Sequence, residues 1–102
     1  MKIIILFSAL LAAASLTQVA SASPELAKSK NCMSCHAPAT KLVGPSFKDI
    51  ASKYRKDPNA PAQLAQKIQN GSQGIWGSIP MPPNSQLTAE DAMTLSRWIL
   101  GQ

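Results

Sequence analysis

The stretch Cys32-Met33-Ser34-Cys35-His36 contains both cysteines and the only histidine of this 102-residue chain. Two thiols separated by two residues, with a histidine directly after the second, form the attachment pattern of c-type haem. The spacing suits that chemistry, because two thioether bonds form along one edge of a porphyrin and the next residue then lies beneath the iron. We therefore predict that Cys32 and Cys35 attach one haem c covalently and that His36 binds its iron.

Three other chemistries use cysteines in similar patterns. A structural zinc site needs four Cys or His ligands, and this chain offers three, all within one pentapeptide. A dithiol redox site normally follows a strand in a βαβ unit, but no strand pattern precedes Cys32. A plain disulfide leaves His36 without a role. These readings stay open on the sequence alone, although haem attachment explains every residue of the motif.

The N-terminal segment has the composition of a secretory signal peptide. Met1-Lys2 is a short basic start, residues 3–16 are almost entirely apolar, and Ala20-Ser21-Ala22 fits a small-residue cleavage site. We predict a signal peptide over residues 1–22, removed on export, and one haem domain over residues 23–102. An uncleaved anchor is the alternative. No later apolar run is long enough to span a bilayer, so we expect a soluble periplasmic protein without stable membrane insertion.

The domain left after cleavage is small. Chains below about 80 residues seldom build a sufficient hydrophobic core and usually need a staple or a cofactor. A covalently held haem would supply a large apolar plate for such a chain to pack around. We therefore predict that the polypeptide without haem is largely unfolded.

Apolar periodicity and capping residues predict an all-α domain, with about four short helices wrapped around one covalently attached haem. The expected helices run from Pro24 to about Lys30 and over Ser46–Tyr54, Pro61–Asn70 and Thr88–Leu100. Ser46 and Thr88 are suitable N-cap residues, and Gly71 is suited to the end of the third helix. Residues 71–87 hold three glycines and three prolines, which favours a long structured loop.

The second iron ligand is expected in that loop. Met81 lies in Ile79-Pro80-Met81-Pro82-Pro83-Asn84, where three prolines fix φ and stiffen the chain. Met33 lies between the two cysteines and should point away from the iron, and Met93 is expected in the core. We therefore predict Met81 as the ligand, the alternative being a methionine that only fills a gap.

His/Met ligation closes the iron to small molecules and raises its potential. It therefore predicts electron transfer and not enzymatic catalysis. One rival is an enzyme or gas sensor in which Met81 leaves and the iron binds a small ligand. A second is a dithiol oxidoreductase without haem. A third is a haem domain that works only inside a larger complex.

The chain is basic, with a formal net charge of +5. Basic residues crowd its first half: Lys28, Lys30, Lys41, Lys48, Lys53, Arg55 and Lys56. Such a surface can steer encounter with redox partners that carry acidic docking surfaces, or it can simply be a solvated face. Nucleic acid is not an expected partner, because no basic helix with interleaved aromatic residues occurs.

Four stretches and the end of the chain resemble class I c-type cytochromes, in particular the small bacterial cytochrome c-551/c-552 group, also called cytochrome c8. The stretches are C-M-S-C-H at 32–36, V-G-P-S-F-K-D-I at 43–50, L-A-Q-K-I-Q-N-G-S-Q-G-I-W-G at 64–77 and I-P-M-P-P-N at 79–84, followed by a terminal R-W-I-L. The resemblance implies a monomeric, periplasmic, one-haem electron carrier between respiratory partners, with a nitrite reductase or terminal oxidase as a possible acceptor.

The same resemblance implies roles for four further residues. The Pro45 carbonyl would accept a hydrogen bond from the second ring nitrogen of His36 and fix its tautomer. Trp76 and Lys67 would approach a haem propionate, although relatives often have Arg at the lysine position, which pairs in a different geometry. Asn84 would donate its side-chain amide towards the Met81 sulfur.

Overall fold

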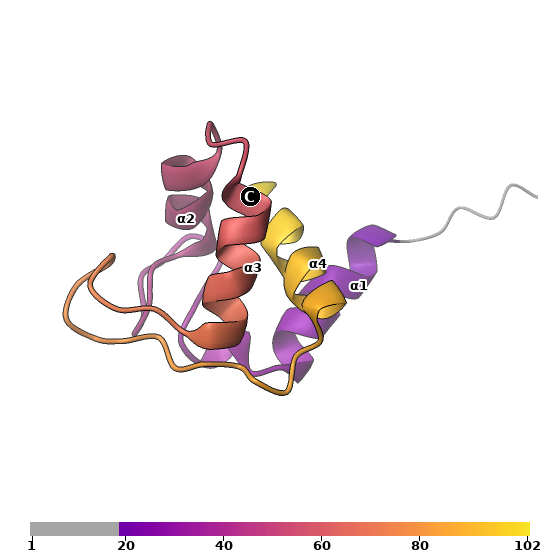
Figure 1. The fold of residues 1–102 in the computed structure, drawn as a ribbon, viewed down its shortest axis with the longest axis horizontal. Helices are drawn as coiled ribbons and strands as arrows, with labels where there is room; N and C mark the ends of the chain where they lie inside the picture. Colours follow the sequence, from indigo (N-terminus) through magenta and orange to yellow (C-terminus); the bar gives the residue numbers. More distant parts are fainter. Residues whose placement is uncertain (1–18) are drawn as a thin grey trace, which may run out of the picture.

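The computed structural model describes residues 19–102, which form four α-helices and one short 3₁₀ helix (Figure 1). The elements are α1 (Val19–Ser29), η1 (Cys32–Ser34), α2 (Phe47–Tyr54), α3 (Ala60–Asn70) and α4 (Ala89–Leu100). Within this part of the chain, β-type pairing is limited to two isolated bridges, so the predicted all-α fold is confirmed. Most of the expected signal peptide, residues 1–18, lies outside the described residues.

Helix α4 is the centre of the packing, because it contacts each of the other three α-helices (Figure 1). Its buried face includes Ala92, Leu95 and Ile99, which recur at the spacing of one helix side. The Thr88 hydroxyl accepts a hydrogen bond from the Asp91 N–H at 3.0 Å. This cap satisfies one of the free N–H groups at the helix start, as the sequence predicted.

Helices α2 and α3 also begin and end close to the expected residues. The Ser46 hydroxyl accepts from the Asp49 N–H at 3.1 Å and caps α2. Gly71 follows α3 with φ 78°, a left-handed conformation that glycine adopts without steric cost. The local capping chemistry therefore places both helices to within one residue.

Helix α1 differs from the expectation. It begins at Val19 and not at Pro24, so Pro24 lies inside the helix and the predicted cap Ser23 is buried within it. The prediction assumed a chain that starts after Ala22, whereas the described chain continues in helical conformation across that point. Proline lacks an N–H and removes one backbone hydrogen bond there, but the helix continues through it.

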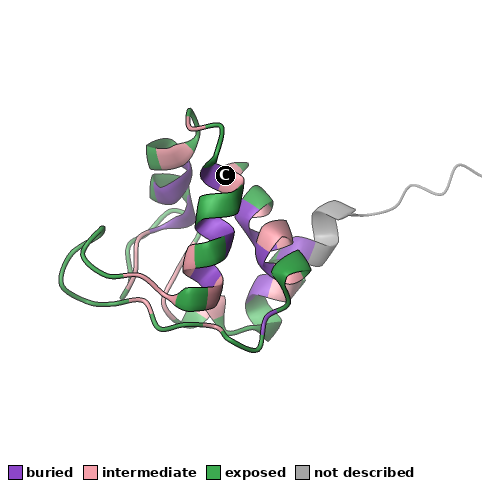
Figure 2. Ribbon diagram, viewed as in Figure 1, coloured by how far each residue is buried: buried purple, intermediate pink, exposed green. Residues whose placement is uncertain are grey.

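The described residues include no helix whose length and apolar character would let it cross a membrane. Buried side chains line the inner faces of the helices, whereas the loop between α3 and α4 is mostly exposed (Figure 2). The main cluster contains Ala27, Phe47, Ile50, Leu64, Ala65, Ile68, Leu87, Ala92, Leu95 and Ile99. Most of the loop over residues 71–87 extends to one side of the helices (Figure 1), although Leu87 near its end belongs to the core. Residues of both the helices and this loop line the candidate site.

Candidate functional site

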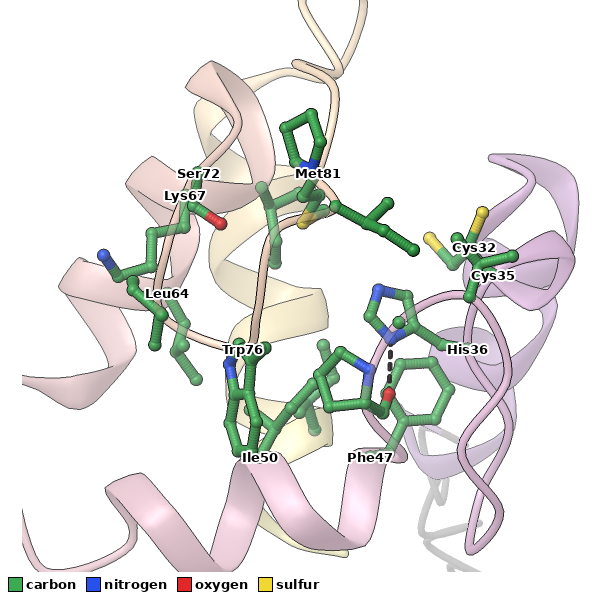
Figure 3. Close-up of a pocket in the computed structure, with 18 of the residues that line it drawn as sticks. Cys32, Cys35, His36, Phe47, Ile50, Leu64, Lys67, Ser72, Trp76 and Met81 are labelled. Atoms are coloured by element: carbon green, nitrogen blue, oxygen red, sulfur yellow. Dashed lines mark hydrogen bonds between the residues drawn. The ribbon is translucent and has the colours of Figure 1, made fainter.

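A cavity of about 330 Å³ separates the helices from the loop that joins α3 and α4. Cys32, Cys35 and His36 line it from the N-terminal part of the chain, and Met81 lines it from the loop (Figure 3). Much of the remaining wall is apolar, with Ile50, Leu64, Ile68, Leu95 and Ile99 among its residues. Four potential ligating or attaching groups therefore face one apolar space, although they come from distant parts of the sequence.

The short helix η1 brings the two thiols and the imidazole together. The N–H groups of Cys35 and His36 both donate to the Cys32 carbonyl, at 3.2 and 3.0 Å. Asn31 enters this turn with φ 62°, a conformation that asparagine tolerates better than most residues. Both cysteines are free and half-buried, and burial raises the pKa of the Cys32 thiol. The two thiols are thus held beside His36 at the cavity wall.

The imidazole of His36 is fixed by its own neighbours. Its Nδ1 lies 2.6 Å from the Pro45 carbonyl oxygen. A carbonyl only accepts, so Nδ1 carries the proton and Nε2 has its lone pair available for a metal. The ring stacks on Phe47 with centroids 5.4 Å apart.

Gly44 covers the imidazole and was not singled out by the sequence analysis. A Cβ at this position would lie 2.7 Å from Cε1 of His36, closer than non-bonded carbon atoms pack. There is no room for a side chain at residue 44, so even a methyl group would require the imidazole or the backbone to move. The signal available in the sequence was the Gly-Pro pair that follows the motif.

Met81 is fixed through its backbone. Its N–H donates to the Ser72 carbonyl at 2.9 Å, and its carbonyl accepts from the Ser72 N–H at 3.1 Å. Met33 and Met93 pack against the core, and among the described methionines only Met81 lines the cavity. Of the three candidates weighed from the sequence, the structure therefore brings one to the cavity that His36 faces.

Trp76 and Lys67 both line the cavity, as expected of groups that would approach a propionate. Lys67 is half-buried, and the Trp76 indole, 39% exposed, carries its N–H towards the same space (Figure 3). The structure adds a neighbour that the sequence analysis missed, because the Lys53 Nζ lies 5.5 Å from the Trp76 ring centroid. A cation over an aromatic face is attractive.

Asn84 is placed differently from its expected role. Its Nδ2 donates to the Ile68 carbonyl at 3.0 Å, and the side chain is not among the cavity lining. One amide hydrogen is therefore used to hold the loop against α3. The second amide hydrogen is left for any contact with the Met81 sulfur.

The donor set fits haem better than a bare metal ion. Among the described residues, no cluster of three or more His, Cys, Asp or Glu side chains could hold a metal ion, which disfavours zinc. Two adjacent thiols, an imidazole nitrogen with a free lone pair and a thioether instead surround a large apolar cavity. This is the donor chemistry of a covalently attached haem with one nitrogen and one sulfur ligand.

Comparisons with known proteins agree with this geometry. The family model described as cytochrome c matches residues 20–102. Cytochrome c-551 of Pseudomonas aeruginosa is 53% identical over 77 residues, which cover 76% of this chain and 73% of the relative. Cytochrome c-552 of Nitrosomonas europaea is 52% identical over 81 residues, which cover 79% of each protein.

Solved structures give the same result. The crystal structure of wild-type Nitrosomonas europaea cytochrome c552 matches with a TM-score of 0.75 and 51% identity, covering 76% of this chain and 96% of that one. The class 1 cytochrome MtoD from Sideroxydans lithotrophicus ES-1 matches with a TM-score of 0.67 and 28% identity, covering 80% of this chain and 94% of that one. Sequence and fold matches thus point in one direction.

Proposed function

Because this chain belongs to the cytochrome c family, whose members carry electrons on a covalently bound haem c, we propose that it is a periplasmic carrier with His36 and Met81 as axial ligands. Membership confirms the resemblance seen in the sequence, the haem c cofactor and a role as a one-haem electron carrier in a non-enzyme family. The ligands, the compartment and the partners are the proposal.

One observation carries the ligand assignment. The His36 Nδ1 is occupied by the Pro45 carbonyl at 2.6 Å, which leaves Nε2 for iron, and Met81 reaches the same cavity from the loop. The hydrogen bond also makes the imidazole more electron-rich. Bound haem would supply an iron that changes between the ferrous and ferric states. The polypeptide would supply two ligands whose supports do not depend on that change.

The two thiols are proposed to attach the haem. Cys32 and Cys35 lie at the cavity wall directly before His36, so attachment there would keep the imidazole beside the metal. Two thioether bonds would also prevent loss of the cofactor.

Trp76 and Lys67 are proposed to contact a propionate, and Lys53 to hold the Trp76 ring in place from outside. The support is that both Trp76 and Lys67 line the cavity, where the indole N–H and the ammonium group could each donate to a carboxylate. Asn84 is proposed to direct its second amide hydrogen to the Met81 sulfur while the first remains on Ile68.

The test is a set of spectra of protein matured with haem-attachment machinery, in both oxidation states, with and without carbon monoxide. We expect a c-type reduced spectrum, a weak iron–sulfur band in the oxidised state and no carbon monoxide shift. Met81→Ala should lose the weak band, whereas the matched control Met93→Ala should keep it. Ready carbon monoxide binding by the native protein would instead favour the sensor or enzyme reading.

Export and cleavage after Ala22 form a separate part of the proposal. The basic start, the apolar run and the Ala20-Ser21-Ala22 site support it. A helix that starts near Pro24 would also lose nothing from the missing N–H, since the first helical N–H groups have no partner within the helix. The intact mass of protein purified from the periplasm gives the answer. If the protein is instead found in the membrane fraction with residues 1–22 still attached, this segment is an uncleaved anchor.

The partners are proposed to be respiratory redox proteins with acidic docking surfaces, a nitrite reductase or terminal oxidase being the acceptor class suggested by the resemblance. The support is the excess of basic residues. Electrostatic steering raises encounter rates and is screened by salt. The electron-transfer rate to an acidic partner should therefore fall as ionic strength rises, and a flat dependence would remove this part of the proposal. Size-exclusion chromatography tests the expected monomer.

A further inference from the structure

The C-terminal end of α3 is hydrogen-bonded at two points to the segment that carries Met81. Ser72, just past the helix, exchanges two backbone hydrogen bonds with Met81, at 2.9 and 3.1 Å. Inside the helix, the Ile68 carbonyl accepts from both the backbone N–H of Asn84, at 3.1 Å, and its side-chain Nδ2, at 3.0 Å. The segment from Met81 to Asn84 is therefore fastened at both ends to one turn of chain.

Gly71 lies between these two points in the sequence, and the Met81 segment passes close to it. A Cβ on Gly71 would lie 2.5 Å from the Met81 carbonyl oxygen and 3.0 Å from the Pro83 nitrogen. Both are backbone atoms, so they cannot turn aside as a flexible side chain would. Gly71 itself is tied to α3 by its N–H, which donates to the Lys67 carbonyl at 2.8 Å. Gly71 and the Met81 segment are therefore both held by backbone hydrogen bonds, which oppose a movement of either away from the other.

We propose that Gly71 is a positioning residue for the Met81 thioether: the absence of a side chain lets the Met81 backbone lie against the end of α3. This inference rests on the proposed ligation by Met81. A thioether sulfur is a weak hydrogen-bond acceptor, so its position must come from the main chain that carries it. A side chain at residue 71 would push the Met81 carbonyl away from Ser72 and move the sulfur within the cavity.

The chain contains a matched control at Gly74. Gly71 and Gly74 both have a positive φ, 78° and 77°, but a Cβ on Gly74 would meet no protein atom within 4 Å. Alanine at either position therefore carries backbone strain from the positive φ. Only alanine at residue 71 also crowds the Met81 segment, so Gly74→Ala controls for a substitution at a positive φ without that crowding.

The experiment compares four haem-loaded proteins: the native chain, Gly71→Ala, Gly74→Ala and Met81→Ala. For each, the oxidised iron–sulfur band is recorded and the ferrous form is titrated with carbon monoxide. We expect Gly71→Ala to weaken the band and to raise the fraction that binds carbon monoxide by about tenfold, as a displacement costing a little over 1 kcal/mol would. Gly74 also lines the cavity, so we expect Gly74→Ala to change both readings less than Gly71→Ala does.

The outcomes separate this inference from the proposed function. If Met81→Ala keeps the band, ligation by Met81 is wrong. If that variant loses the band but Gly71→Ala behaves like Gly74→Ala, the positioning role is overturned. A lower melting temperature of Gly71→Ala with an unchanged band and unchanged carbon monoxide binding also overturns it, since the role would then be structural only.

A second variant covers the case in which Gly71→Ala does not accumulate with haem. Ser72→Pro removes the N–H that donates to the Met81 carbonyl and adds no Cβ at residue 71. It should raise carbon monoxide binding above that of Gly74→Ala. No rise would overturn the claim that the end of α3 positions Met81.

Discussion

The two sides of the cavity hold their proposed ligands by different means. On one side the His36 side chain itself is held, because Nδ1 bonds to Pro45, one face stacks on Phe47 and Gly44 packs against the ring. On the other side the backbone of Met81 is held, by Ser72 and by the close passage of Gly71.

The difference follows from the chemistry of the two side chains. An imidazole has a second nitrogen, so a protein can grip it while leaving the first free for a metal. A thioether has one weakly accepting sulfur and no other polar atom. A segment that presents methionine must therefore be made stiff by its main chain, and three nearby prolines and the pairing with Ser72 do this.

Removal of the haem should have the largest effect on both sides of the cavity, because the cofactor would connect them. We expect haem-free protein to lose most of its helix signal, since the cavity is lined by much of the core and the domain is small. Far-ultraviolet circular dichroism during heating is the measurement. A cooperative, native-like transition in the haem-free chain would show that the helices fold without the cofactor.

Gly44→Ala attacks the His36 side alone. A Cβ 2.7 Å from the imidazole should destabilise the haem-loaded protein by about 1–3 kcal/mol through overpacking. Denaturant unfolding followed at the haem absorbance gives the free energy. Gly101→Ala is the control, because its Cβ would lie an ordinary 3.4 Å from the Trp98 carbonyl and its φ is −83°. Equal free energies of unfolding for the two variants would mean that the close contact between residue 44 and the imidazole does not affect stability.

Trp76→Phe probes the Met81 side through the loop. Loss of the indole N–H would leave a propionate charge less compensated, which favours ferric iron and lowers the reduction potential. A difference of about 1 kcal/mol between the two oxidation states corresponds to roughly 45 mV for one electron, so we expect a decrease of this order. Trp98→Phe is the control, since Trp98 packs edge-on against Phe47 with centroids 5.1 Å apart. Voltammetry that finds the larger shift for Trp98→Phe would disprove the assignment.

Ionisation of Tyr54 should give the smallest effect on stability. This residue is not among those that hold His36 or Met81 in place. Burial raises the pKa of its phenol above the ordinary value of 10.0. The unfolded chain therefore loses this proton first as the pH rises, and stability falls above pH 10 until the folded phenol also ionises. Tyr54 is the only tyrosine, so ultraviolet absorbance reports it directly. Its pKa should be unchanged in Gly44→Ala and Gly71→Ala, and a shift in either would link the two sides through α2.

Sequence reasoning was accurate where the determinants are local. The ends of α2 and α4 follow from Ser46 and Thr88, whose hydroxyls bond to N–H groups three residues later. The end of α3 follows from Gly71 for a similarly local reason. The start of α1 was wrong by five residues, since a helix can run through Pro24 when more chain precedes it.

Features that depend on distant residues were beyond that reasoning. Nothing in the local pattern reveals that Ser72 pairs with Met81 or that Asn84 turns its amide to Ile68. The approach of Lys53 to Trp76 likewise joins α2 to the long loop. The motif and the proline loop identified candidate ligands, but only the fold shows what holds each in place.

Because Met81 is attached to the end of α3, the length of that helix determines where Met81 lies. An α-helix rotates by about 100° for each added residue, so one residue inserted into α3 would swing Ile68 and Gly71 away from their partners. The loop around Gly77 is restricted for a different reason, because Gly77 lines the cavity beside Trp76. An insertion in either the helix or the loop would therefore alter the cavity, so a tag or a surface tether belongs elsewhere in the chain.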